Sequence, residues 1–205
     1  MKIIYHRQIT QQAVGSQVSQ RVLDAIIAAN IGQDVLRYQV GHDRFHYDSN
    51  AFFSGDAYVE SQHAIIHPAL TQGDPQAAWQ AFGRLSHAVQ DLYAHSNYAA
   101  LWLAKKNSAD LSPEQIDPLD VDILSSPDLH SGKPDIFDML QYLNLLPNRW
   151  LKLAPKDSHI LLNIDGPDRA YFEFVFSAAV KRTQFEFSRV LSSLTIDSRK
   201  VLADS

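Results

Sequence analysis

The sequence predicts an all-α fold: a single domain over residues 1–205, built as a bundle of about five to seven helices. Two observations carry this prediction. Apolar residues recur every three or four positions over long stretches, which is the period of one helix face. Short alternating runs, which are typical of strands, are almost absent. With 45% hydrophobic and 20% charged residues, the chain can form one sizeable core and is not a disordered protein.

The N-terminal part of the chain predicts two helices. The first runs from about Ile9 to Ala29, where valines and alanines fall three or four apart, and Asn30 and Gly32 would end it. A polar, irregular stretch follows over residues 41–55. The second helix is expected from Asp56 to Leu70.

The longest expected helix begins at Pro75 and continues to about Lys106. Asp74 precedes it as an N-cap, and Pro75 suits the first turn, where its missing amide hydrogen is not needed. Lys105 and Lys106 lie at its end, where positive charge interacts favourably with the helix dipole. The sequence therefore predicts one continuous helix through the centre of the chain.

The C-terminal half is expected as a loop followed by three helices. Residues 107–133 are rich in Asp, Pro and Ser and predict a long loop, which either shapes a functional site or wraps the surface. Two short helices are expected over Ile136–Leu145 and Asn148–Leu153. The last helix is expected from about Pro167 to Leu194.

Composition excludes several classes of protein. The chain has no Cys, which excludes a disulfide framework, a thiolate zinc finger and a Cys nucleophile. Its net charge of −5 argues against a nucleic-acid-binding surface. No apolar run reaches the length of a membrane span. The start MKIIYHRQITQQ is no secretory signal, so a cytoplasmic location is expected, with secretion by another route left open. The oligomeric state stays open.

Histidine and aspartate dominate the polar chemistry of the chain. It contains 19 Asp against 4 Glu, together with 9 His. Glu is the better helix former, whereas Asp is typical of caps, turns and metal sites. The composition therefore indicates chemistry based on oxygen and imidazole groups.

The most informative motif is the series His87, Asp91 and His95, spaced four residues apart on the longest expected helix. Each step of four turns a helix by about 400°, so the three side chains form one narrow stripe. Apolar neighbours surround the stripe, and a buried carboxylate between two imidazoles needs compensation. A divalent cation would supply it, with Asp91 able to bridge two metal ions. Hydrogen bonds within a polar core are the other interpretation.

Further histidines and carboxylates could join the stripe, because a bundle brings side chains of different helices together. The candidates are His6, His46, Asp48, His63, His67 and His159. Each alone also has a structural interpretation, such as an exposed, turn or helix-end residue. One known pattern is incomplete, because Glu60-x-x-His63 has no second copy for a di-iron bundle. Another is unspecific, because the His42-Asp43 dyad of HD-type phosphohydrolases needs only a flanking His and a distant Asp, which a chain of this composition always offers.

Four segments resemble those of HET-C-like proteins and bacterial zinc-dependent phospholipase C. The stretch from Gly83 to Asn97, GRLSHAVQDLYAHSN, is similar to the family pattern G-x-x-x-H-x-x-Q-D-x-x-A-H-S-N. Residues 46–48, 6–10 and 161–168 resemble the family's His-aromatic-Asp segment, its N-terminal opening and its C-terminal segment. The resemblance implies an all-α bundle of the phospholipase C/P1 nuclease-like type with two or three zinc ions. The implied ligands are His6, Asp48, His63, His87, Asp91, His95 and His159, with His46 and His67 as alternates.

The expected function is a metal-dependent hydrolase of a phosphoester, with a phospholipid as one candidate substrate. Zinc would lower the pKa of a bound water toward about 7, and Mn²⁺ or Fe²⁺ would also suit His and Asp ligands. Asp48 is a candidate base, and Arg84 could hold a phosphate with two hydrogen bonds. Ser86, Gln90 or Asn97 could orient the imidazoles. The alternative is a non-catalytic HET-C-like helical protein that works through partner contacts, with a structural metal or none.

Overall fold

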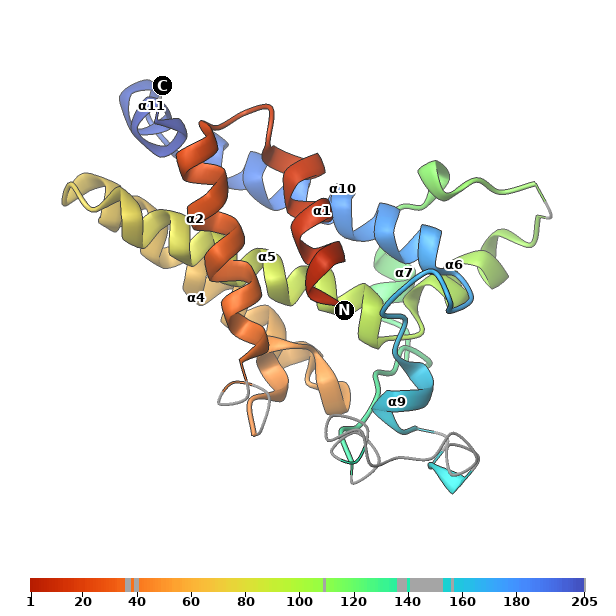
Figure 1. The fold of residues 1–205 in the computed structure, drawn as a ribbon. Coiled ribbons are helices and arrows are strands. Elements are labelled where there is room, and N and C mark those ends of the chain that lie inside the picture. The colour runs from red at the N-terminus through yellow and green to blue at the C-terminus, as the bar shows by residue number, and fades with distance from the viewer. Residues whose placement is uncertain are drawn as a thin grey trace.

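A computed structural model describes residues 1–35, 38, 41–108, 110–135, 140, 153–155 and 157–204 (Figure 1). The described residues form nine α-helices and no strand, which confirms the all-α prediction. The helices are α1 (Ile3–Val14), α2 (Gln20–Ile31), α4 (Phe52–Thr71), α5 (Pro75–His95), α6 (Tyr98–Lys106), α7 (Val121–Leu124), α9 (His159–Leu162), α10 (Phe172–Ser193) and α11 (Ile196–Ala203). Short 3₁₀ turns lie at 32–34, 43–45, 48–50 and 113–115. Within the described part, no helix is long and apolar enough to cross a membrane.

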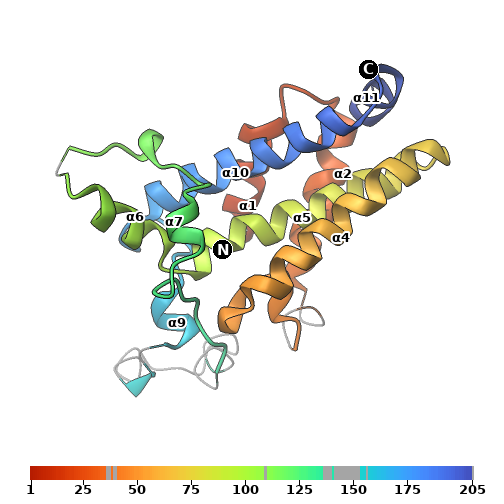
Figure 2. The ribbon, with the colours of Figure 1, turned by 180° about the vertical axis from the view of Figure 1, so that it is seen from behind.

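Helix α5 is the central element of the fold. Helices α2, α4 and α10 all pack against it, and α1 lies against α2 and α10 (Figures 1 and 2). Every residue from Leu85 to His95 is therefore buried, including the polar ones. Gly83 allows the close approach of α2, because a Cβ there would lie 2.4 Å from the carbonyl oxygen of Ile26. The predicted stripe thus lies inside the bundle and not on its surface.

The first expected helix is two helices in the structure. Helix α1 already begins at Ile3 and ends at Val14, and α2 begins at Gln20. Ser19 starts the second helix, because its hydroxyl accepts a hydrogen bond from the amide of Val22 at 3.3 Å. The apolar spacing continued across this break, so periodicity alone did not reveal it.

The longest expected helix is also divided in the structure. The N-cap prediction is confirmed, since the Asp74 carboxylate accepts a hydrogen bond from the amide of Ala77 at 3.0 Å. Helix α5 ends at His95, however, because Ser96 is extended, with φ −117° and ψ 169°, before α6 begins at Tyr98. This break directs the chain toward residues 128–131, where the Asn97 amide donates to the carbonyl of Asp128 at 2.9 Å.

The C-terminal elements differ in part from the expectation. Residues 107–133 are mostly loop, as expected, apart from the 3₁₀ turn and α7. The helices expected at Ile136–Leu145 and Asn148–Leu153 lie almost entirely outside the described residues. The last long helix begins only at Phe172 and is followed by α11, a separate helix. Thr195 caps α11 by accepting from the amide of Ser198 at 3.2 Å. The stretch 159–162, where no helix was expected, forms α9.

Candidate metal centre

Six parts of the chain bring ionisable side chains together around Asp91, in the middle of the bundle. The side chains come from α1 (His6), the 3₁₀ turn after α2 (Asp34), the turns before α4 (His46 and Asp48), α5 (His87, Asp91 and His95), α9 (His159) and the segment after it (Asp165). Two subsets have ligand atoms that all lie within 4.8 Å of one another. The first group is His6, Asp34, His87 and Asp91, and the second group is Asp48, His95 and His159.

Each of the two groups is buried apart from one partly exposed side chain. The side chains of His6, His87 and Asp91 are fully buried in the first group, and Asp34 is 16% exposed. In the second group, His159 is 18% exposed, and the nearby Asp165 is 33% exposed. The centre is therefore mostly buried, and it comes nearest to solvent at Asp165, beside the second group.

The orientation of His6 is fixed by Gln90, the residue directly before Asp91 on α5. The Gln90 amide group donates to the hydroxyls of Thr10 at 3.1 Å and Thr183 at 3.2 Å, so its carbonyl oxygen faces Nδ1 of His6 at 2.7 Å. Nδ1 of His6 therefore carries the hydrogen, and Nε2 has a free lone pair. Nε2 lies 3.2 Å from Oδ1 of Asp91 without a hydrogen bond. Two buried lone pairs so close together favour a cation between them.

His46 and His95 show the same arrangement. Nε2 of His46 donates to the backbone carbonyl of Tyr38 at 3.2 Å, while Nδ1 faces Oδ2 of Asp91 at 2.9 Å. Nδ1 of His95 forms a hydrogen bond with the carbonyl of His46 at 3.2 Å and lies 3.0 Å from Oδ1 of Asp48. Nε2 of His95 consequently faces Oδ1 of Asp91 at 3.6 Å. In each ring the nitrogen away from Asp91 is a hydrogen-bond donor, as is typical of metal-ligating histidines.

The N-terminal ammonium group of the chain shows that this centre favours positive charge. The Met1 nitrogen lies 2.9 Å from Oδ1 of Asp91, 3.1 Å from Oδ1 of Asp165 and 3.0 Å from Nε2 of His95. Burial acts to lower the pKa of this ammonium, but Asp165, Asp91 and Asp34 raise it to about 11. The ammonium occupies the kind of position that a metal cation would take between these oxygen and nitrogen atoms.

The protonation states of His87, Asp91 and Asp165 suit metal ligation, whereas burial acts to lower the pKa of His46 and Asp91 raises it above its usual value. Burial lowers the pKa of His87 to about 4, against the opposing charge of Asp91, so the imidazole is neutral at pH 7. Burial acts to raise the pKa of Asp91, yet His95 and the ammonium hold it well below its usual value. The pKa of Asp165 is lowered to about 2 by the same two neighbours, also against burial. Neutral imidazoles and ionised carboxylates are the forms that bind divalent cations.

Six of the seven side chains implied as metal ligands lie in this centre together with the alternate His46, and His63 does not. Nε2 of His63 lies 2.8 Å from Oε2 of Glu186, at the contact of α4 and α10. The alternate His67 is exposed on α4. Arg84, expected to hold a phosphate, donates from Nε to the side-chain oxygen of Gln62 at 2.7 Å and belongs to neither group.

The sequence did not single out Asp34 or Asp165. Asp34 follows a helix end and Asp165 precedes Gly166-Pro167, so both match ordinary turn residues. Of the three residues expected to orient imidazoles, Gln90 does so directly. Ser86 acts one step further away, because it accepts from Asn30, which in turn donates to Gln90. Asn97 instead holds the loop at 128–130.

One protein family matches the part of the chain that carries most of the centre. A family model described as the VWA7 N-terminal domain matches residues 3–119. This span covers more than half of the chain and includes His6, residues 46–48 and the stripe on α5, while His159 and Asp165 lie beyond it. No curated protein and no solved structure matches the chain.

This match corrects the family inferred from short motifs. The segment from Gly83 to Asn97 lies inside the matched span, but the matching family is neither HET-C-like nor phospholipase C-like. A stripe of His, Asp and Gln on one helix face is what any ligand-bearing helix of a bundle would show, so it does not distinguish families. The family match likewise carries no description of this chain as a hydrolase.

Proposed function

The chain belongs to the VWA7 N-terminal domain family, and we propose that this domain binds divalent metal ions at the centre around Asp91. One observation carries the proposal. In His6, His46 and His95, one ring nitrogen forms a hydrogen bond with a neighbouring group. The other ring nitrogen of each faces the buried carboxylate of Asp91. A buried cluster of acceptors is costly unless a cation compensates it.

The two groups would each hold one ion, and the carboxylate of Asp91 faces both. Oδ2 of Asp91 lies 2.9 Å from Nε2 of His87, and Oδ1 lies 3.6 Å from Nε2 of His95. Imidazole and carboxylate ligands without thiolates fit Zn²⁺, and they also suit Mn²⁺ and Fe²⁺. Such an ion supplies Lewis acidity and a water of lowered pKa when bound.

Hydrolysis of a phosphoester is a second candidate function, favoured by the surface next to the second group. A cavity of about 120 Å³ opens there, lined by Lys2, Ile160, Asn163, Asp165, Asp168 and Arg169. Lys2 is 56% exposed and pairs with Asp168 at 3.3 Å, so its ammonium can turn toward an anion in this cavity. Arg169 is committed to backbone carbonyls, which leaves Lys2 as the cation available to a phosphate.

Metal content of the purified protein tests metal binding. We expect stoichiometric Zn²⁺, Mn²⁺ or Fe²⁺ by elemental analysis, removal by a chelator, and restoration on adding the metal back. His87→Ala should abolish binding at the first group. His67→Ala is the matched control, because this histidine is exposed and belongs to neither group. Protein that binds none of the three metals, while folded by circular dichroism, contradicts the proposal.

A synthetic phosphodiester, bis(p-nitrophenyl) phosphate, tests the second candidate with the metal-loaded protein. Lys2→Gln should lower kcat/KM about tenfold through loss of an anion contact. Lys105→Gln is the control, since Lys105 pairs with Asp120 and Asp122 at the surface. If the metal-loaded protein shows no turnover above free metal ions, the ions have a structural role, and metal binding stands without hydrolysis.

A further inference from the structure

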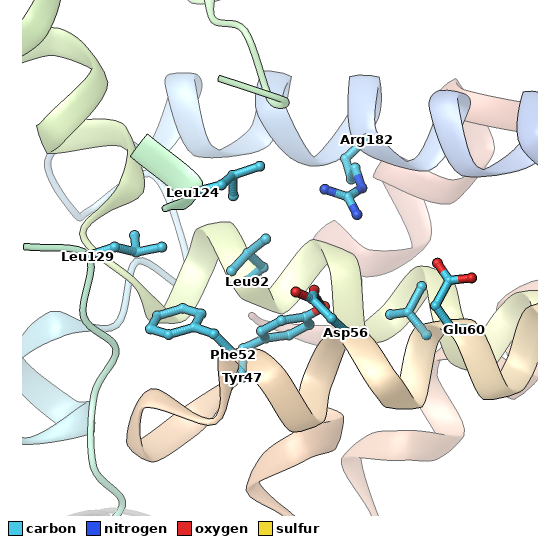
Figure 3. Close-up of a pocket in the computed structure, with 9 residues that line it drawn as sticks. Tyr47, Phe52, Asp56, Glu60, Leu92, Leu124, Leu129 and Arg182 are labelled. Carbon is cyan, nitrogen blue, oxygen red and sulfur yellow. Dashed lines mark hydrogen bonds between the residues drawn. The ribbon is translucent and has the colours of Figure 1, made fainter. Parts of the chain in front are cut away.

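A second cavity lies beside α5, between α4 and α10. It has a volume of about 270 Å³, which is near the lower end for small-molecule sites. Figure 3 shows that α4, α5, α7 and α10 surround it. The lining residues are Tyr47, Phe52, Asp56, Val59, Glu60, Leu92, Leu124, Leu129 and Arg182. None of them belongs to either metal group.

The cavity has a charged end and an apolar end. In Figure 3, Arg182, Asp56 and Glu60 lie toward one end, while Leu124, Leu129 and Phe52 lie toward the other. The middle is formed by Leu92 and the ring of Tyr47 (Figure 3). A ligand that fills this space therefore has its charges together at one end and an apolar body at the other.

The positive charge at this end belongs to Arg182. Its Nε donates to Oε1 of Glu186 at 2.7 Å, and its terminal nitrogens face the cavity (Figure 3). Burial acts to raise the pKa of Glu186, but the hydrogen bonds from His63 and Arg182 lower it to about 2, so the ion pair persists at pH 7. Arg189 also donates to Glu186, at 2.8 Å, and Arg182 interacts with the Tyr93 hydroxyl as well. A guanidinium has five N–H groups, so Arg182 can still bind another acceptor.

The negative charge available to a ligand belongs to Asp56. Its Oδ1 accepts a hydrogen bond from the hydroxyl of Tyr47 at 2.7 Å, which is a neutral partner. Glu60, by contrast, is paired with Arg189 through contacts of 2.9 and 3.1 Å. Asp56 and Arg182 line the same cavity, yet they form no ion pair with each other in the described structure.

The wall that carries Asp56 is held in place before any ligand binds. Tyr47 has a positive φ of 57°, and its ring lies directly on the backbone of Gly55, where a Cβ would come within 2.6 Å. Only glycine lets the ring lie this close to α4, and the ring then positions its hydroxyl on Asp56. A preorganised wall lowers the entropic cost of binding.

These observations exclude simple ions as the best ligand. An anion on Arg182 would lie beside the carboxylate of Asp56, and a cation on Asp56 would lie beside the guanidinium of Arg182. We propose that this cavity binds a small zwitterion with an apolar body, of the class of α-amino acids with aliphatic or aromatic side chains. The carboxylate pairs with Arg182, the ammonium pairs with Asp56, and the side chain lies among the leucines and Phe52. This proposal does not depend on metal binding.

Titration calorimetry with three matched compounds tests the ligand class on the full chain. L-leucine carries both charges, 4-methylpentanoate lacks the ammonium, and 3-methylbutylamine lacks the carboxylate. We expect L-leucine to bind at least about tenfold more tightly than either analogue. If 3-methylbutylamine binds as tightly as L-leucine, the cavity is a cation site. If 4-methylpentanoate binds as tightly as L-leucine, it is an anion site. Either result overturns the proposal. So does the absence of binding by both L-leucine and L-phenylalanine at millimolar concentration.

Two variants locate the binding in this cavity. Asp56→Asn keeps the shape of an exposed side chain and should weaken L-leucine binding about tenfold. Asp24→Asn is the matched control and should leave it nearly unchanged, because Asp24 is also exposed, accepts a hydrogen bond from the neutral Gln20 and does not line this cavity. Leu124→Trp adds bulk to the apolar end without changing charge and should also abolish binding. L-leucine binding that survives both Asp56→Asn and Leu124→Trp overturns the proposal.

Discussion

The side-chain oxygen of Gln90 lies 2.7 Å from Nδ1 of His6, across 84 positions of sequence, and determines which nitrogen of that imidazole faces Asp91. Since Gln90 donates to two threonine hydroxyls, its amide cannot turn round without losing those bonds. The tautomer of His6 is thus decided by α5 and α10 together.

Removing the Gln90 oxygen should weaken metal binding. Gln90→Leu leaves Nδ1 of His6 without an acceptor, so we expect affinity for Zn²⁺ to fall about 10–100-fold in competition with a chelator. Gln90→Glu is the matched variant, because it keeps the acceptor for His6 and should retain most of the affinity. Equal affinity of wild type and Gln90→Leu would show that the His6 tautomer does not matter for metal binding.

Substitutions at Asp91 and at His159 should remove different amounts of bound metal. Asp91 faces both groups, so Asp91→Asn should remove all stoichiometric metal. His159 belongs to the second group alone and lies at its exposed side, so His159→Ala should spare the ion of the first group. Elemental analysis after gel filtration measures both. The same residual metal content in the two variants would contradict the division into two groups.

Acid should destabilise the protein through Glu186. Its pKa is lowered from the usual 4.5 to about 2, so its contribution to stability is complete above about pH 4.5 and is lost as pH falls toward 2. Glu186→Gln cannot take up a proton there; it leaves Arg182 without a carboxylate and Arg189 with Glu60 alone, which costs about 3–5 kcal/mol at pH 7.

The difference in the free energy of unfolding between wild type and Glu186→Gln should therefore shrink as pH falls from about 4.5 to 2. Urea denaturation at a series of pH values measures it. Glu60→Gln, 59% exposed, is the control and should change stability by less than about 1 kcal/mol. A constant difference between wild type and Glu186→Gln over this pH range would contradict the assignment.

Two glycines on facing helices should respond oppositely to alanine. A Cβ at Gly83 would lie 2.4 Å from the carbonyl of Ile26 and 2.7 Å from the Cβ of Ala29, so Gly83→Ala should destabilise the protein by about 1–3 kcal/mol. A Cβ at Gly32 meets nothing within 4 Å, and its backbone is helical, so Gly32→Ala should be neutral or stabilise by about 0.4–1 kcal/mol. Denaturant titrations compare the two, and equal effects would contradict the close crossing of α2 and α5.

Local rules of sequence explain much of the fold. The period of apolar residues gave the all-α class, and the Asp74-Pro75 pair gave the start of α5. The same rules did not find the breaks at Ser19 and Ser96, because each break depends on hydrogen bonds that compete with a helix whose apolar period continues through it. The short helix α9 was missed for the related reason that few residues define it.

The sequence by itself determined the stripe of His87, Asp91 and His95, since four-residue spacing places these side chains on one helix face whatever the rest of the chain does. Only the tertiary structure decided which distant side chains join it. His6, Asp34 and Asp165 reach Asp91, whereas His63 pairs with Glu186. Such contacts depend on how α1, α4 and α10 pack around α5, and packing is set by the whole core and not by local spacing.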